Sequence, residues 1–172
     1  MFQKFYPDEW VDSTYVIPFE QYYEKGYRGI LFDIDNTLVR HGEPATKEAE
    51  ELFERLHKIG FSTCLISNNK KERVDLFTEN IDTHSIYKAG KPKIAGYEKA
   101  MEEIGCNRKN TLFVGDQLFT DVWGAKRTGI YSILVKPIHP KEEIQIVLKR
   151  YLEKIVLAEY KRHMKKSGVK EK

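Results

Sequence analysis

Short apolar segments alternate with amphipathic helical segments over residues 29–135. The strand-like segments read GILFDI (29–34), FSTCLIS (61–67), SIYKA (85–89), TLFVGD (111–116) and YSILV (131–135). In the stretches between them, apolar residues recur at helical spacing. Strands joined in this way need crossover connections, which are right-handed and produce parallel pairing. The sequence therefore predicts a three-layer, Rossmann-like α/β fold, a parallel sheet with helices on both faces.

The first of the predicted helices has clear limits. Pro44 is expected to open it, because proline is tolerated in a first helical turn, and Gly60 is expected to end it. An apolar stripe lies between them: Ala49, Leu52, Phe53, Leu56 and Ile59. Further helices are predicted around Val74 and Phe77, between Ile94 and Gly105, and over residues 121–129.

The two ends of the chain differ from the middle. Residues 1–27 hold nine of the 21 aromatic side chains, and we expect them to fold over the sheet as a cover. Exposure to a lipid interface is the alternative, since aromatic rings favour that environment. We expect residues 1–140, with this lead-in, to form one domain and residues 141–172 to form a separate C-terminal helix and tail.

The C-terminal segment is basic. Residues 141–172 contain ten Lys or Arg and five Asp or Glu, whereas the first 140 residues contain 19 and 21. A long amphipathic helix is predicted over 141–166, with one apolar face formed by Ile144, Leu148, Tyr151, Leu152, Ile155 and Tyr160. A basic helix suits an anionic partner, either a lipid surface or nucleic acid. A solvated, fraying terminus is the alternative.

The sequence gives no sign of a membrane span, a signal peptide or a disulfide framework. No apolar stretch is long enough to span a bilayer, and MFQKFYPDEW at the N-terminus lacks the pattern of a signal peptide. Cys64 and Cys106 form no C-x-x-C pair, so neither a disulfide framework nor a zinc site is indicated. A cytoplasmic protein is expected.

Acidic residues stand where predicted strands end. Asp33 closes the first strand and Asp116 closes the fourth, and each has a second acid nearby, Asp35 and Asp121. In a parallel sheet these strand ends lie at the same edge. Neighbouring carboxylates repel each other unless a cation lies between them, and Mg2+ prefers such oxygen ligands. The alternative for Asp33 and Asp35 is a turn cap without a metal.

Further polar residues stand at the ends of other elements. Ser67 in LISNN offers a hydroxyl and the following backbone N–H groups to phosphate oxygens, and Lys91 in GKPK offers a positive charge. Asn68 is a candidate substrate contact, with an Asx turn as the alternative. His41 and Asn69 also flank these motifs.

Together the motifs resemble the haloacid dehalogenase (HAD) superfamily of phosphohydrolases: D-x-D-x-T at 33–37, Ser67, Lys91, and G-D-x-x-x-x-D at 115–121. The resemblance implies a Mg2+-dependent phosphatase. Asp33 would be the nucleophile that forms an aspartyl phosphate, and Asp35 the general acid and base. Thr37, Ser67 and Lys91 would hold the phosphoryl group. The implied metal ligands are Asp33, Asp35 through its carbonyl, Asp116 and Asp121.

The spacing of these motifs leaves no room for an inserted cap domain, as in subfamily IIIA. An open site suits a phosphate carried on a macromolecule or a membrane. SNN, DIDNTLV and YPDEWVDSTYVIP are similar to YqeG-type bacterial proteins and to mitochondrial phosphatidylglycerophosphate phosphatases. The implied substrate is a lipid phosphate at the anionic inner face of the membrane. A soluble nucleotide, sugar phosphate or phosphoprotein is the alternative substrate, and a nucleic-acid-binding or ribosome-linked module is the alternative function.

Overall fold

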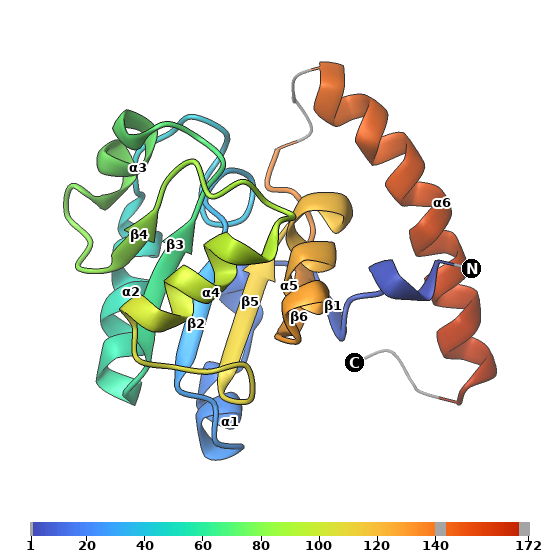
Figure 1. Cartoon of the computed structure of the whole chain (residues 1–172), viewed down its shortest axis with the longest axis horizontal. Helices are drawn as coiled ribbons and strands as arrows, with labels where there is room; N and C mark the ends of the chain where they lie inside the picture. Colours follow the sequence, from blue (N-terminus) through green and yellow to red (C-terminus); the bar gives the residue numbers. More distant parts are fainter. Residues whose placement is uncertain (1, 140–143, 169–172) are drawn as a thin grey trace.

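The computed structural model describes residues 2–139 and 144–168. One sheet of six strands forms the centre of the molecule (Figure 1). The strands are β1 (Glu9–Val11), β2 (Gly29–Phe32), β3 (Ser62–Ile66), β4 (His84–Ile86), β5 (Thr111–Gly115) and β6 (Tyr131–Val135). The α-helices are α1 (Phe19–Glu24), α2 (Lys47–Ile59), α3 (Lys71–Thr78), α4 (Ile94–Glu103), α5 (Trp123–Thr128) and α6 (Ile144–Lys166). Two short 3-10 helices, η1 (Gln3–Phe5) and η2 (Thr14–Val16), and a π-helix, η3 (Leu118–Val122), complete the described elements.

The sheet order is β1-β6-β5-β2-β3-β4, and every pair of neighbours is parallel. At the end of the central strand β2, Phe32 lies opposite Val114 of β5 and Leu65 of β3. The residues that follow these three strands therefore meet at one edge of the sheet, where ligands bind in folds of this class. The predicted parallel α/β architecture is confirmed.

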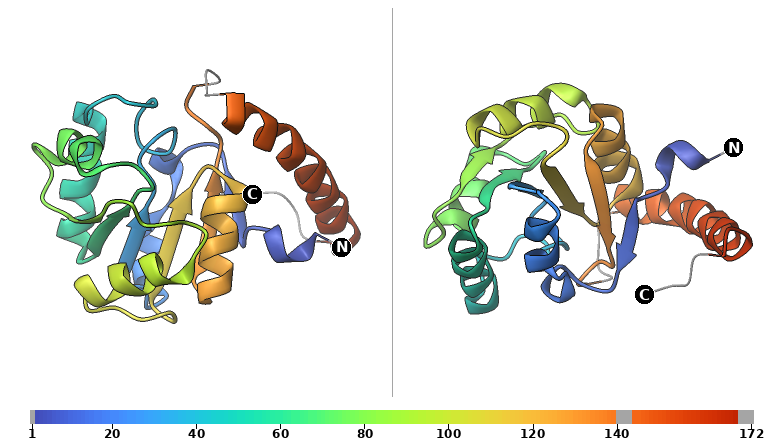
Figure 2. Two further views of the ribbon diagram at one scale, coloured as in Figure 1. Left: turned by 45° about the horizontal axis from the view of Figure 1, so that its top comes forward. Right: turned by 90° about the horizontal axis from the view of Figure 1, so that it is seen from below.

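Helices cover both faces of the sheet (Figure 2). Successive side chains of a strand point to opposite faces, and β2 shows the consequence. Ile30 and Phe32 belong to the core beneath α1, α2 and α3, where Phe53 also lies. Leu31 belongs to the opposite core, beneath α4 and α5, together with Tyr97. Both cores are fully buried, so the sheet is rigid beneath the edge that carries the acids.

Helix α2 begins later than predicted. Its first residue is Lys47, because the side chain of Thr46 caps it by accepting a hydrogen bond from the Ala49 N–H at 3.2 Å. The expectation that Pro44 opens the helix is wrong: a side-chain cap satisfies a free N–H, which proline cannot do. The predicted end is confirmed, since Gly60 follows the helix with φ of +114°.

The N-terminal segment does more than cover the sheet. Residues 9–11 form β1, an edge strand paired with β6 that the prediction missed because it is only three residues long. Of the nine aromatic residues of the segment, three are buried and six are half-buried, as expected of a cover. Just after β1, the Thr14 hydroxyl donates to the Thr37 carbonyl at 2.8 Å and the Tyr15 hydroxyl to the Leu38 carbonyl at 2.6 Å.

Helix α6 runs beside the sheet, next to the N-terminal segment (Figures 1 and 2). In the apolar face predicted for this helix, the structure exposes Leu148, Tyr151, Leu152 and Ile155 and buries Tyr160. Ile144 lies outside the described side chains. The helix instead turns Glu153, Val156 and Tyr160 inward. Among the described residues, no helix has the length and apolarity needed to cross a bilayer.

Candidate active site

Three acids from two loops form a compact cluster at the sheet edge. Asp33 follows β2 directly, and its N–H donates to the Val114 carbonyl of β5 at 3.0 Å. Asp116 follows β5, and Asp121 lies in η3. One carboxylate oxygen from each acid lies within 4.8 Å of the others, and all three side chains are buried. The convergence predicted for these three acids is thus present in the fold.

A tight turn places Asp121 against the end of β5. Its Oδ2 accepts hydrogen bonds from the backbone N–H groups of Asp116 and Gln117, each at 3.1 Å. A Cβ on Gly115 would lie 2.6 Å from the same oxygen, so a side chain there would collide with the carboxylate. The glycine therefore permits the close approach that brings both acids of the motif to one point.

Lys91 joins two acids of the cluster. Its Nζ donates to Asp33 Oδ1 at 2.6 Å and to Asp121 Oδ1 at 2.8 Å, and the side chain is almost fully buried. Burial disfavours the charged form of the lysine, yet the carboxylates of Asp121 and Asp33 outweigh it and raise its pKa. Lys91 is therefore a fixed positive charge beside the Asp33 carboxylate.

Thr37 lies on the opposite side of Asp33 from this lysine contact. Its Oγ1 is 3.2 Å from Asp33 Oδ2 and 3.1 Å from Asp116 Oδ1. A hydroxyl has one hydrogen and donates to one acceptor at a time, so these two acids share it. The Thr14 hydroxyl supports the Thr37 carbonyl from the N-terminal segment.

Burial disfavours the charged form of the acids in the cluster, even though Lys91 and Arg150 contact them. Burial raises the pKa of Asp33 to about 6, against the opposing effect of Lys91 and with a further increase from Asp121. Burial and the neighbouring Asp33 charge raise the pKa of Asp116 well above its ordinary value. Clustered carboxylates in a dry site are the donor set of a hard divalent cation, so the residues present fit such an ion.

Asp35 lies apart from the three-acid cluster. Its carboxylate accepts hydrogen bonds from Arg73 Nη2 of α3, Asn69 Nδ2 and the Gly42 N–H, each at 2.8 Å. The Nδ1 of His41 is 3.9 Å from the same group. The side chain therefore faces α3, and its predicted role as general acid stays a prediction.

Ser67 and Asn68 follow β3 beside the cluster. The Ser67 side chain is buried, and its Oγ accepts a hydrogen bond from the Asn69 N–H at 3.1 Å. The Asn68 side-chain amide makes two hydrogen bonds to the main chain of Lys91. Its Nδ2 donates to the Lys91 carbonyl at 3.1 Å, and its Oδ1 accepts from the Lys91 N–H at 2.7 Å. In this arrangement Asn68 positions Lys91, and the predicted contact with substrate stays a prediction.

Two residues of α6 reach the site, and the sequence reasoning missed both. Arg150 contacts the carboxylate and the main-chain carbonyl of Asp116, and its Nη1 is 3.0 Å from Glu153 Oε2. Glu153 is buried and accepts a hydrogen bond from the Leu118 N–H at 2.8 Å. The available signal was an Arg–Glu pair at i, i+3, with Glu153 as the single acid in the stretch 144–158, whose other charged residues are basic.

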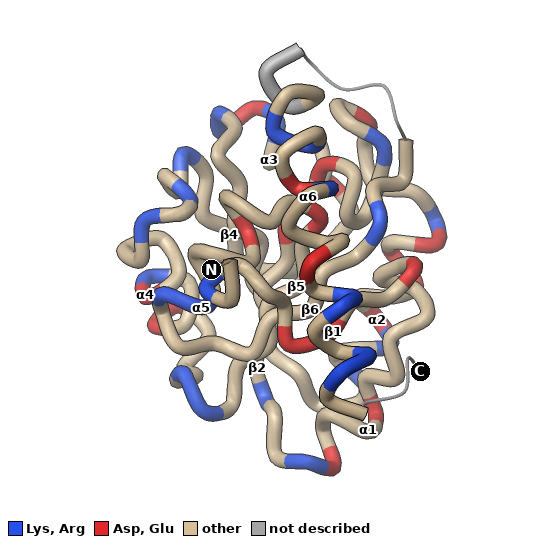
Figure 3. Tube along the Cα trace, turned by 90° about the vertical axis from the view of Figure 1, so that its right-hand side faces the viewer, with Lys and Arg blue, Asp and Glu red and all other residues tan. Residues whose placement is uncertain are grey.

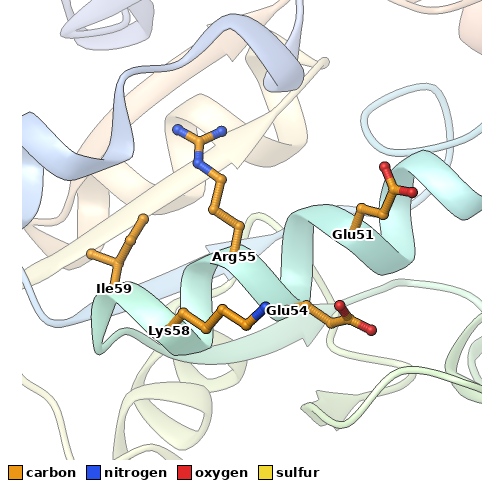
Figure 4. A pocket seen from close by; sticks show the side chains of 5 residues that line it. All are labelled: Glu51, Glu54, Arg55, Lys58 and Ile59. Carbon is orange, nitrogen blue, oxygen red and sulfur yellow. The ribbon is translucent and has the colours of Figure 1, made fainter.

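A hollow of about 500 Å³ on α2 is a competing location (Figure 4). Its lining residues are Glu51, Glu54, Arg55, Lys58 and Ile59. It shares no residue with the sheet-edge cluster, and Arg55 already pairs with Glu20 at 2.6 Å. Exposed, mutually opposing charges of this kind contribute little binding energy. The sheet edge is therefore the candidate site.

Residues 43–129 match the family model of haloacid dehalogenase-like hydrolases. Over 164 residues the chain is also 36% identical to the Bacillus subtilis protein named "Probable phosphatase YqeG", covering 94% of this chain and 95% of that protein. The chain belongs to the haloacid dehalogenase-like hydrolase family. Both matches confirm the prediction of an enzyme of the phosphatase type, and the second confirms the likeness to YqeG-type proteins.

Two further relatives of this hydrolase extend the comparison. It is 26% identical over 160 residues to "Phosphatidylglycerophosphate phosphatase 1, chloroplastic/mitochondrial" of Arabidopsis thaliana, covering 87% of this chain but 45% of that protein. A solved structure from Bacteroides fragilis, described as a haloacid dehalogenase-like hydrolase, superposes with a TM-score of 0.55 at 16% identity. That match covers 70% of this chain and 93% of the other, and it supports the fold alone.

Proposed function

We propose that this hydrolase is a Mg2+-dependent phosphomonoesterase that uses Asp33 as its nucleophile. The observation that carries the proposal is the buried cluster of Asp33, Asp116 and Asp121, with Lys91 bonded to the first and the last. When bound, Mg2+ would be held by these acids and the Asp35 carbonyl, and it would neutralise charge on the phosphoryl group.

The reaction proceeds in two displacements. An Asp33 carboxylate oxygen bonds to phosphorus as the ester P–O bond breaks, and the leaving oxygen takes a proton from Asp35. Asp35 then removes a proton from water, whose oxygen attacks phosphorus and releases inorganic phosphate and free Asp33. Lys91, Thr37 and Ser67 hold the phosphoryl oxygens, because phosphoryl transfer depends mainly on positioning and charge neutralisation.

The position of Asp35 adds a condition to this scheme. Its carboxylate is bonded to Arg73 and Asn69. To protonate a leaving group, it has to leave these partners, take up a proton from solvent and face the leaving oxygen. Arg73 and Asn69 therefore hold the Asp35 carboxylate beside the site, away from the reacting atoms. On substrate binding the side chain turns toward the leaving oxygen.

For the substrate we propose a lipid phosphate, phosphatidylglycerophosphate, which the enzyme hydrolyses to phosphatidylglycerol. The reaction takes place at the anionic inner face of the membrane. The similarity to the Arabidopsis phosphatase supports this choice. The architecture supports it too. Residues 33–91, which the structure describes throughout, hold only α2, β3, α3 and β4 as regular elements, so no cap domain is inserted there, as in the capless subfamily IIIA type. An open edge admits a headgroup that stays attached to a bilayer.

The test is phosphate release by the full-length protein from defined substrates. Phosphatidylglycerophosphate in mixed micelles is compared with a nucleoside monophosphate, a sugar phosphate and a phosphopeptide, each with Mg2+ supplied or chelated by EDTA. We expect the lipid to have the highest kcat/KM and chelation to abolish release. Faster turnover of any soluble phosphate would refute the lipid substrate, and release that survives chelation would refute the metal requirement.

A further inference from the structure

The outer side of α6 carries an exposed apolar patch, which we call the α6 patch: Val147, Leu148, Tyr151, Leu152 and Ile155. Each of these side chains is between 51 and 67% exposed. Leu148, Tyr151, Leu152 and Ile155 follow the spacing i, i+3, i+4, i+7, so they form one continuous stripe. A contiguous exposed stripe of large apolar side chains marks an interaction surface.

The exposed charges among the described side chains of α6 are positive. Basic positions recur along the helix (Figure 3). The exposed ones are Lys149, Lys154, Lys161, Arg162, Lys165 and Lys166. The described side chains of α6 (residues 147–166) include two acids: Glu153 is buried, and Glu159 is half-buried. In the described part of α6, the outward side therefore combines exposed apolar and positive groups, and no fully exposed acid lies among them.

The α6 patch borders the active-site edge of the sheet. Arg150, within the same turns, contacts Asp116 from the inner side of the helix. Further along, Val156 and Tyr160 pack against Tyr6 and Leu118 and hold the helix to the body. The patch is thus fixed relative to the site, and the basic residues Lys161, Arg162, Lys165 and Lys166 lie further along the helix, beyond the patch.

We propose that the α6 patch docks the enzyme on an anionic lipid surface. An apolar stripe flanked by lysines fits the interface of an acidic bilayer, where the apolar side chains insert and the basic residues attract the anionic headgroups. Nucleic acid offers no apolar surface to cover the aliphatic stripe. A second copy of the chain, docked through the same patch, would bring two positively charged faces together, and these would repel each other. The proposal rests on the proposed function and deepens it, because it assigns the surface that presents the site to a lipid phosphate.

Vesicle flotation with the full-length protein tests this assignment. The vesicles contain phosphatidylcholine alone or with phosphatidylglycerol, and no phosphomonoester. Leu152→Asp alters the patch, and Leu76→Asp is the matched control, since Leu76 is an exposed leucine of α3. We expect the wild type to float with phosphatidylglycerol vesicles, Leu152→Asp to bind about tenfold more weakly, and the control to bind like the wild type. Hydrolysis of p-nitrophenyl phosphate should be the same for all three proteins.

Several results would overturn the proposal. Equal flotation of wild type and Leu152→Asp would do so, as would the absence of flotation with anionic vesicles. Light scattering that shows a dimer lost in Leu152→Asp would assign the patch to a second copy. Displacement from the vesicles by RNA, with RNA binding lost in Leu152→Asp, would assign it to nucleic acid. Because no phosphate is hydrolysed in flotation, failure here is distinct from failure of the proposed phosphatase reaction.

Discussion

The sheet edge and α6 both depart from the rule that apolar residues lie inside and charges outside, but in different ways. At the sheet edge, buried acids are compensated within the chain: Lys91 bonds Asp33 and Asp121, and Arg150 contacts Asp116. On α6, apolar side chains point outward, and no described residue covers them. The first departure is typical of a site built for a small charged ligand. The second is typical of a surface that has a partner outside the chain.

The largest expected effect is at the sheet edge, on Asp33. Asp33→Asn removes the attacking oxygen, and we expect phosphate release to fall at least about 10³-fold. The fold should persist, because a neutral amide replaces a buried carboxylate whose pKa is raised by burial. Asp12→Asn, at an exposed acid, is the control and should keep wild-type rates. Equal rates in the two variants would remove Asp33 from the mechanism.

Lys91→Met tests how far the buried acids depend on their internal cation. The substitution leaves Asp33 and Asp121 without a shared positive charge, and we expect the free energy of unfolding without metal to fall by about 3–5 kcal/mol. The matched control is Lys126→Met. Lys126 pairs with Asp8 near the surface, and such an ion pair contributes at most about 1 kcal/mol to the free energy of unfolding. Denaturant unfolding with EDTA present measures both. A loss no larger than that of the control would mean that Lys91 does not stabilise the cluster.

A pair of substitutions on α6 compares its two sides. Val156→Asp buries a charge beside Glu153, and we expect about 3 kcal/mol of destabilisation or release of the helix. Leu152→Asp places the same charge on the exposed side and should change the free energy of unfolding by less than about 0.5 kcal/mol. Chemical denaturation and hydrogen exchange of α6 would measure the difference. Equal effects would show that the helix does not pack as described.

The smallest expected effect concerns pH. Burial raises the pKa of Asp33 from 3.8 to about 6, so without metal the folded chain retains a proton that the unfolded chain loses. The free energy of unfolding without metal should therefore fall as the pH rises from about 4 to about 6. Mg2+ binding needs the deprotonated form, so its affinity should weaken about tenfold from pH 7 to pH 5. Titration calorimetry at the two pH values measures this, and equal affinities would contradict it.

Much of the sheet edge was predictable, because its parts are local. Each of Asp33, Ser67 and Asp116 follows an apolar strand directly, and parallel strands bring such ends together whatever their separation in the chain. Even the approach of Asp121 to Asp116 has a local signal in Gly115. Strand periodicity and strand ends were thus enough to predict the fold and the meeting of Asp33 with Asp116, whereas the place of Asp121 in the cluster was implied by the resemblance to the HAD motifs.

The remainder depends on tertiary contacts that periodicity does not encode. The α6 sequence predicts an amphipathic helix, but it does not show which side of the helix packs on the body. Glu153 turns inward because its carboxylate accepts a hydrogen bond from the Leu118 N–H there. β1 is too short to show a period, and pairing with β6 alone makes it a strand. The contact of Arg73 with Asp35 depends on how α3 lies over the loop. In each case a specific polar partner, far away in the sequence, decides the outcome.

The central claim is that Asp33 forms a covalent ester with the phosphoryl group. Rapid quenching during turnover, followed by borohydride reduction, converts an aspartyl phosphate into homoserine, which peptide mass spectrometry locates. We predict homoserine at position 33 in the wild type and none in Asp33→Asn. Homoserine at position 35 or 116, or none at all while phosphate is being released, would contradict the account.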